Sequence, residues 1–328
     1  AVIGVILSVI HAIMNILLVV KFGMGGESLL ISTIAGSLVI SIVIAIRIKI
    51  WEFIDFTKVS KLQINKQLQF GIPLIPNQIS WWIMGLIGKY ILIYFHSPSD
   101  NGILAVASKF PGLLTTIYTI SFLAWTENAI REFESDNRDE YYSKGFLLFS
   151  KFTLCSAACL LPVIKFYYII TITGQFADSW KYVPILIIGT LLNSFAAFLG
   201  TVYTASMKTI DAFKTTVIAA VSNLLLSLLM IPAFSIWGVA VANMLSFAVL
   251  FIVRISSVST IIKFKFRLYQ MIPSILLLVV SIIGYYTLNV YYQIILLLVF
   301  AVGALIINKF IVLELVNLLI NLKNKQCK

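Results

Sequence analysis

The stretch SWWIMGLIGKYILIYF, residues 80–95, is almost entirely apolar, yet it contains one lysine, Lys89. Counted from residue 68, the apolar run is long enough to cross the roughly 30 Å hydrocarbon core of a membrane as a helix. A helix is required because lipid offers the backbone no hydrogen-bond partner. A lysine at the centre of such a helix costs about 2.5–3.5 kcal/mol, so Lys89 needs a physical explanation.

The rest of the chain has the same character as this stretch. Hydrophobic residues make up 60% of the 328 residues and charged residues 11%, whereas soluble proteins have about 45–50% and about 25%. The composition predicts an all-α, polytopic membrane helix bundle of about ten transmembrane helices. The expected spans cover residues 1–20, 28–46, 68–95, 103–126, 146–170, 183–206, 215–234, 238–257, 270–288 and 291–312.

The basic residues indicate how the chain is oriented. If the first span runs outward, nearly every lysine and arginine outside the spans falls in an inner loop or in the C-terminal tail, and Arg254 is assigned to one of these loops. Lys21 and Lys181 are the exceptions. Positive loops face the cytoplasm, so the C-terminus is expected there. This asymmetry accounts for the net charge of +11 without a nucleic-acid partner.

One polar stretch, residues 47–67, alternates apolar side chains with lysines, as a helix lying on the membrane surface does. It separates two spans from the eight that follow. The expected division is two helices of one lobe (1–50), a cytoplasmic interfacial linker (51–67), a six-helix lobe (68–260), and two extra helices with a cytoplasmic tail (261–328).

Two lysines occupy equivalent positions on adjacent spans. Lys89 lies six residues before Phe95 and Lys109 six residues after Ile103, so both stems begin roughly 9 Å below the outer boundary, at 1.5 Å per residue. Each lysine either extends to the outer headgroups or lines a wet cavity. The spans contain no deep carboxylate, so a bound anion such as phosphate is the natural partner.

Polar residues share helix faces with these lysines. At about 100° per residue, one stripe contains Gln78, Trp82, Gly85 and Lys89, and a second contains Ala105, Lys109, Gly112 and Thr116. Asn193 belongs to a face of small residues that suits either helix packing or a cavity. Asn77 follows Pro73 and Pro76, where freed carbonyls and a polar side chain are suited to line a path.

Catalytic and metal-binding constellations are not found. The two histidines, His11 and His96, are far apart in the chain, and the three cysteines lack metal-ligand spacing. We therefore expect neither an enzyme nor a bound metal or cofactor.

Several segments resemble the Wzx-type polysaccharide flippases, the O-antigen and capsule exporters of the multidrug/oligosaccharidyl-lipid/polysaccharide exporter superfamily. FGIPLIPNQISWWIMGLIGKYILIYF (70–95), GILAVASKF (102–110) and ISFLAW (120–125) are similar to the family's seventh and eighth helices. FADSWKYVPILIIGTLLNSFAAFLGTVYTASMKT (176–209) and NLLLSLLMIPAFSIWG (223–238) are similar to the tenth and eleventh.

The resemblance implies a two-lobe, MATE-like transporter fold that lacks about the first four helices. It implies that undecaprenyl-diphosphate-linked oligosaccharide crosses the bacterial cytoplasmic membrane by alternating access, with polymerase or assembly proteins as partners. Gly88-Lys89 stands where many members have Asp-Arg. The lysines would hold the diphosphate, and Trp81 or Trp82 would stack on sugars. The candidate substrate-binding residues are Lys89, Lys109, Gln78, Trp82, Trp81, Asn77, Thr116 and Asn193.

Two alternatives stay open. A multidrug/cation antiporter of the same superfamily would need a deep carboxylate. A polytopic polysaccharide polymerase or glycosyltransferase would need a sizeable loop carrying acidic, arginine or histidine residues.

Overall fold

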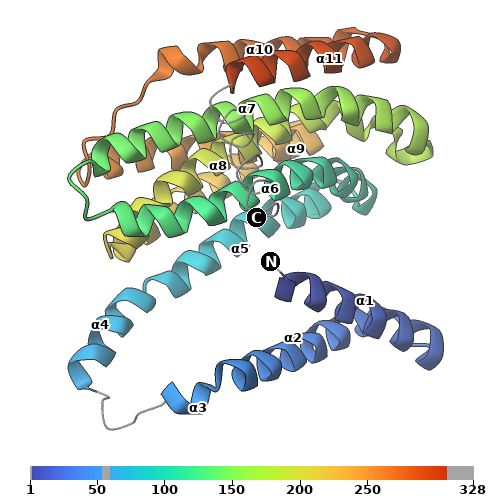
Figure 1. Ribbon diagram of the computed structural model, residues 1–328. Coiled ribbons are helices and arrows are strands. Elements are labelled where there is room, and N and C mark those ends of the chain that lie inside the picture. Colours follow the sequence, from blue (N-terminus) through green and yellow to red (C-terminus); the bar gives the residue numbers. More distant parts are fainter. Residues whose placement is uncertain (1, 54–59, 309–328) are drawn as a thin grey trace, which may run out of the picture. The chain divides into compact units, whose positions relative to one another are not determined.

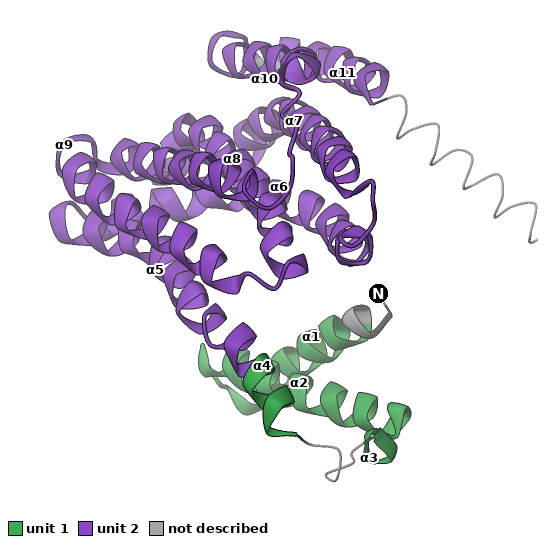
Figure 2. Cartoon of the chain, turned by 90° about the vertical axis from the view of Figure 1, so that its left-hand side faces the viewer, with its two compact units in different colours: residues 1–67 green, residues 68–328 purple. Residues whose placement is uncertain are grey.

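The computed structural model describes residues 2–53 and 60–308, and every regular element in these ranges is a helix. The chain divides into two compact units, residues 1–67 and 68–328 (Figure 2). The middle of the expected linker, residues 54–59, and the end of the last expected span with the tail, 309–328, lie outside the described residues.

The first unit is a helical hairpin followed by two shorter helices. Its elements are α1 (Val2–Phe22), α2 (Glu27–Ile48), α3 (Ile50–Phe53) and the start of α4 (Lys61–Gly71). Small residues at every fourth position of α2, Ser28, Ser32 and Gly36, form its buried face. A Cβ added to Gly36 would lie 2.6 Å from His11 Nε2, so α1 and α2 approach closely, as small residues allow in membranes.

The second unit contains the remaining helices described, among them the three longest, α6, α7 and α9 (Figure 1). They are α5 (Leu74–Phe95), α6 (Pro98–Glu132), α7 (Arg138–Thr171), the 3-10 helix η2 (Gly174–Tyr182), α8 (Val183–Ala205), α9 (Thr209–Val258), α10 (Leu268–Thr287) and α11 (Val290–Ile307). Helix α9 packs mainly on α8 and α5, while α10 and α11 pack on α7.

Helix α9 consists of two antiparallel segments. Its backbone breaks at Ser235, with φ 50° and ψ −124°, shortly after a proline. Asn223 donates to Asn243 across the break at 2.9 Å. A Cβ on Gly238 would lie 2.5 Å from the Met230 carbonyl oxygen, so only glycine fits this turn. The segments coincide with the spans expected at 215–234 and 238–257.

The remaining expected spans also coincide with helices, and the predicted fold class is confirmed. Among the residues that the structure describes, six helices are long and apolar enough to cross a membrane, counting α9 once; α5 is not among the six, and the apolar parts of α1 and α11 are shorter. The main core lies among α6, α7 and α8, where Trp125 stacks between Tyr141 and Phe198 at ring separations of 5.2 and 4.5 Å.

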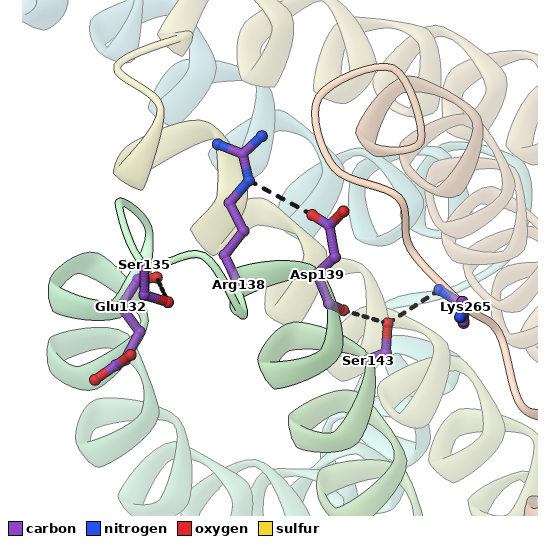
Figure 3. A network of polar contacts seen from close by, with 6 residues as sticks. All are labelled: Glu132, Ser135, Arg138, Asp139, Ser143 and Lys265. Atoms are coloured by element: carbon purple, nitrogen blue, oxygen red, sulfur yellow. Dashed lines mark hydrogen bonds and ion pairs between the residues drawn. The ribbon is translucent and has the colours of Figure 1, made fainter.

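A network of polar contacts fixes the segment before α10 (Figure 3). The Ser143 hydroxyl, on the first turns of α7, donates to the Asp139 carbonyl at 2.6 Å and accepts from the Lys265 backbone N–H at 3.0 Å. Farther along, Ser281 of α10 donates to the Ala158 carbonyl of α7 at 2.7 Å. These bonds attach α10 to α7 at two levels.

Candidate functional site

A cavity of about 320 Å³ opens at the surface of the second unit, between α5, α6, α8 and α9, with Gly85 and Lys89 exposed at its edge. Its lining residues are Trp81, Met84, Gly85, Gly88, Lys89, Leu104, Ser108, Asn193, Val239, Asn243 and Phe247. It brings together three candidate residues predicted from the sequence: Lys89, Trp81 and Asn193. No carboxylate among the described residues lines it.

One side of this cavity is formed by α5, beside its contact with α9. Its buried residues recur every four positions, at Ser80, Met84, Gly88 and Leu92. Gly88 lies against Val239 of α9, where an added Cβ would come within 3.0 Å of the valine Cγ1. Gly88 therefore lets α5 approach α9 closely, and the positions beside this contact, Gly85 and Lys89, line the cavity. Trp81 stacks on Phe247 across this opening, with ring centroids 6.3 Å apart.

The polar groups of this cavity are suited to an anion. The Asn243 Oδ1 accepts a hydrogen bond from the Asn223 amide at 2.9 Å. The Asn243 amide N–H groups therefore remain as donors for a ligand in the cavity. The buried Oδ1 of Asn193 has no hydrogen-bond partner. Lys89 supplies the positive charge and Ser108 a hydroxyl. The Lys89 ammonium, the Asn243 amide N–H and the Ser108 hydroxyl can all donate to phosphate oxygens, whereas the Asn193 Oδ1 needs a donor from another part of the ligand, such as a hydroxyl.

A second, smaller opening continues the first. It has a volume of about 150 Å³ and shares Ser108, Asn243 and Phe247 with the Lys89 cavity. Pro111 of α6 and Gly189 of α8 border it. Pro111 removes a backbone hydrogen bond from α6, and Gly189, where an added Cβ would lie 3.4 Å from the Met244 Cα of α9, puts no side chain into this opening.

Lys109 lines a different cavity from Lys89. Ser108 faces α8 and α9, whereas Lys109, one residue and about 100° further around α6, lines a groove of about 610 Å³ between α6 and α7. The structure therefore does not bring the two lysines to one cavity.

Most of the candidate residues, including the cavity-lining Lys89, are exposed on the surface of this unit. Gln78, Lys89, Lys109 and Thr116 are exposed, and Trp82 is 68% exposed. The Thr116 hydroxyl bonds the Gly112 carbonyl of its own helix at 3.1 Å. Asn77 is half-buried, with an unpaired buried Oδ1.

Arg254 was expected in an inner loop, and this assignment is wrong. It lies inside α9, only 4% exposed. Its guanidinium donates to the Ala196 carbonyl at 2.6 Å, to Thr216 Oγ1 at 3.1 Å and to Thr215 Oγ1 at 3.4 Å. A Cβ on Gly200 would lie 2.8 Å from its Nη1. The arginine thus connects α8 with both segments of α9.

Sequence reasoning also missed Asn243 and Ser108. Asn243 is the one amide side chain in the expected span 238–257, which is a usable signal. Ser108 was missed because the polar face of the span 103–126 was defined by Lys109, and Ser108 lies on a different face of that helix.

No family model and no curated protein sequence matches this chain. Several solved structures do match it. The lipid II flippase MurJ in an inward closed conformation aligns with a TM-score of 0.62 and 19% identity, covering 95% of this chain and 67% of that one. A MATE protein in the straight conformation aligns with a TM-score of 0.62 and 14% identity, covering 79% of this chain and 62% of that one.

An outward-facing multidrug resistance MATE transporter of the MOP superfamily aligns with a TM-score of 0.58 and 13% identity. The chain spans 62% of the length of both MATE structures. These neighbours are transporters and a flippase. The chain is a multi-pass membrane protein with a MATE- and MurJ-like transporter fold.

Proposed function

We propose that this chain forms part of a flippase for undecaprenyl-diphosphate-linked oligosaccharide repeat units. The flippase works by alternating access in the bacterial cytoplasmic membrane, with its C-terminus in the cytoplasm, and serves the biosynthesis of surface polysaccharide such as O-antigen. The observation that carries the proposal is the Lys89 cavity, with one cation, several donors and no carboxylate among its described lining residues.

The chemistry of the cavity favours a lipid-linked diphosphate over a cation. An ammonium group in a low-dielectric setting attracts phosphate strongly and repels a positively charged drug. Trp81 offers an aromatic face beside Lys89, which suits a sugar ring next to the diphosphate. The fold shared with a flippase of a lipid-linked molecule supports the same reading.

A cation antiporter is the second candidate, because MATE transporters share the fold. It would need an acidic residue to exchange protons or sodium with the drug. A polymerase or glycosyltransferase is the third.

The proposed flippase also implies a division of the chain. The two-helix unit is the end of one lobe, residues 68–260 form the other lobe, and the last two helices are an added pair. Its partners would be polysaccharide assembly proteins.

The test uses vesicles containing the protein and a fluorescent polyprenyl-diphosphate oligosaccharide. Lys89→Ala should abolish its transfer between leaflets, and Lys89→Arg should retain much of it, because the charge persists. Lys66→Ala, which alters an exposed lysine in α4, is the matched control. Unchanged transfer by Lys89→Ala would reject the proposed site. Transport of a cationic drug would favour the antiporter, and a lengthened saccharide would favour the enzyme.

A further inference from the structure

The groove that contains Lys109 has a polar end and an apolar end. Rings of Phe110 in α6 and Tyr167 in α7 lie 5.8 Å apart, which places these two antiparallel helices in register. In this register Lys109 lies near the level of Tyr167, and Thr171 lies one turn farther toward the end of α7. The opposite end of the groove is purely hydrocarbon, with Leu113 and Leu160 among its lining residues.

The dimensions of the groove match one leaflet of a bilayer. Along α7 it runs from Leu160 to Thr171, eleven residues or about 16 Å. Half of a hydrocarbon core is about 15 Å. The groove is open at its side, because Leu113 is 51% exposed and Val163 is 45% exposed. Both helices are long and apolar enough to span a membrane, so lipid is the surrounding medium that we expect beside an apolar opening between them.

The charge of the groove selects among lipids. Lys109 is its one charged lining residue, and no carboxylate in the described part of the chain pairs with it. Tyr167 adds a hydroxyl group near the lysine, whereas the Thr171 hydroxyl already donates to the Tyr167 carbonyl at 2.7 Å. A single cation at the polar end of an apolar groove fits a lipid whose headgroup carries a phosphate without a compensating positive charge.

We propose that the α6–α7 groove binds an anionic glycerophospholipid of the surrounding bilayer, with the phosphate on Lys109 and an acyl chain along Leu113, Leu160 and Val163. This site is separate from the Lys89 cavity, so it gives Lys109 a role other than contact with the transported molecule. A bound lipid would fill the space between α6 and α7, and its phosphate would pair with the Lys109 ammonium group.

Native mass spectrometry of the purified protein tests this with phosphatidylglycerol and phosphatidylcholine as probes. We expect one molecule of phosphatidylglycerol to bind about fivefold more tightly than phosphatidylcholine, which is the contribution of one basic residue near an anionic lipid. Lys109→Gln should remove the preference and Lys109→Arg should keep it. Lys66→Gln, the matched control at an exposed lysine that lines neither cavity, should leave it unchanged.

A second variant separates the groove from its charge. Val163→Trp fills the apolar end but keeps Lys109, so it should reduce the binding of both lipids. Retention of the phosphatidylglycerol preference by Lys109→Gln, or full binding by Val163→Trp, would overturn the proposal. Tighter binding of a polyprenyl phosphate than of phosphatidylglycerol at this groove would also overturn it, in favour of the carrier lipid.

Discussion

The buried guanidinium of Arg254 leads to an unusual prediction: a conservative substitution should be worse than a radical one. In Arg254→Lys the positive charge stays buried, but an ammonium group cannot reproduce the fork that serves the Ala196 carbonyl, Thr215 and Thr216 at once. At least one hydrogen bond to a charged group is lost, worth about 1.5–3 kcal/mol. We expect Arg254→Lys to lower the free energy of unfolding by about 2–3 kcal/mol.

In Arg254→Met the charge itself is removed. Both threonine hydroxyls already donate to the Ala212 carbonyl at 2.9 Å, so they keep a hydrogen bond without the arginine. Replacing a buried charged group by an apolar one of similar size is often close to neutral. We therefore expect Arg254→Met to cost less than Arg254→Lys, about 1 kcal/mol.

The assay is reversible unfolding of the purified protein in mixed micelles, followed by tryptophan fluorescence. Gly200→Ala provides a check, because its Cβ would crowd Nη1 at 2.8 Å. It should destabilise the parent protein but cost little more in the Arg254→Met background, so the two effects should not add. A larger loss for Arg254→Met than for Arg254→Lys would refute this reasoning and show that the charge is itself required.

Three further predictions concern packing, cargo and the attachment of the segment before α10. Gly238→Ala should destabilise the protein by about 2 kcal/mol or more, because its Cβ would overlap the preceding backbone, whereas Gly85→Ala meets nothing within 4 Å and should be neutral in the same unfolding assay. Trp81→Ala should slow transfer of the lipid-linked oligosaccharide in vesicles and Trp82→Ala should not, because only Trp81 lines the cavity; equal effects would contradict this. Ser143→Ala should increase hydrogen exchange at the Lys265 amide, and unaltered protection there would show that this hydrogen bond is dispensable.

The sequence predicts the helices well because the signal is local. Uninterrupted apolar runs specify membrane helices, and a proline followed by glycine specifies the reversal near Ser235. Each feature depends on neighbours in the chain, so no tertiary information is needed.

The candidate site is predicted less well because it depends on which helix each face meets. A helical stripe groups Lys109 with Thr116, but it does not reveal that α7 lies beside that face while α8 and α9 lie beside Ser108. Arg254 illustrates a different limit. Counting basic residues by loop treats an arginine near a helix end as part of the cytoplasmic surface, although the threonines and Gly200 that enclose it are distant in sequence.

The abrupt reversal of α9 at Ser235 has a practical consequence for anyone who labels the loops of this protein. Almost no chain is left there to form an epitope, and an inserted tag would have to displace backbone that is already in contact around Gly238. The neighbouring η2 segment is the better place for a reporter cysteine, because Asp178 and Lys181 pair there on an accessible surface.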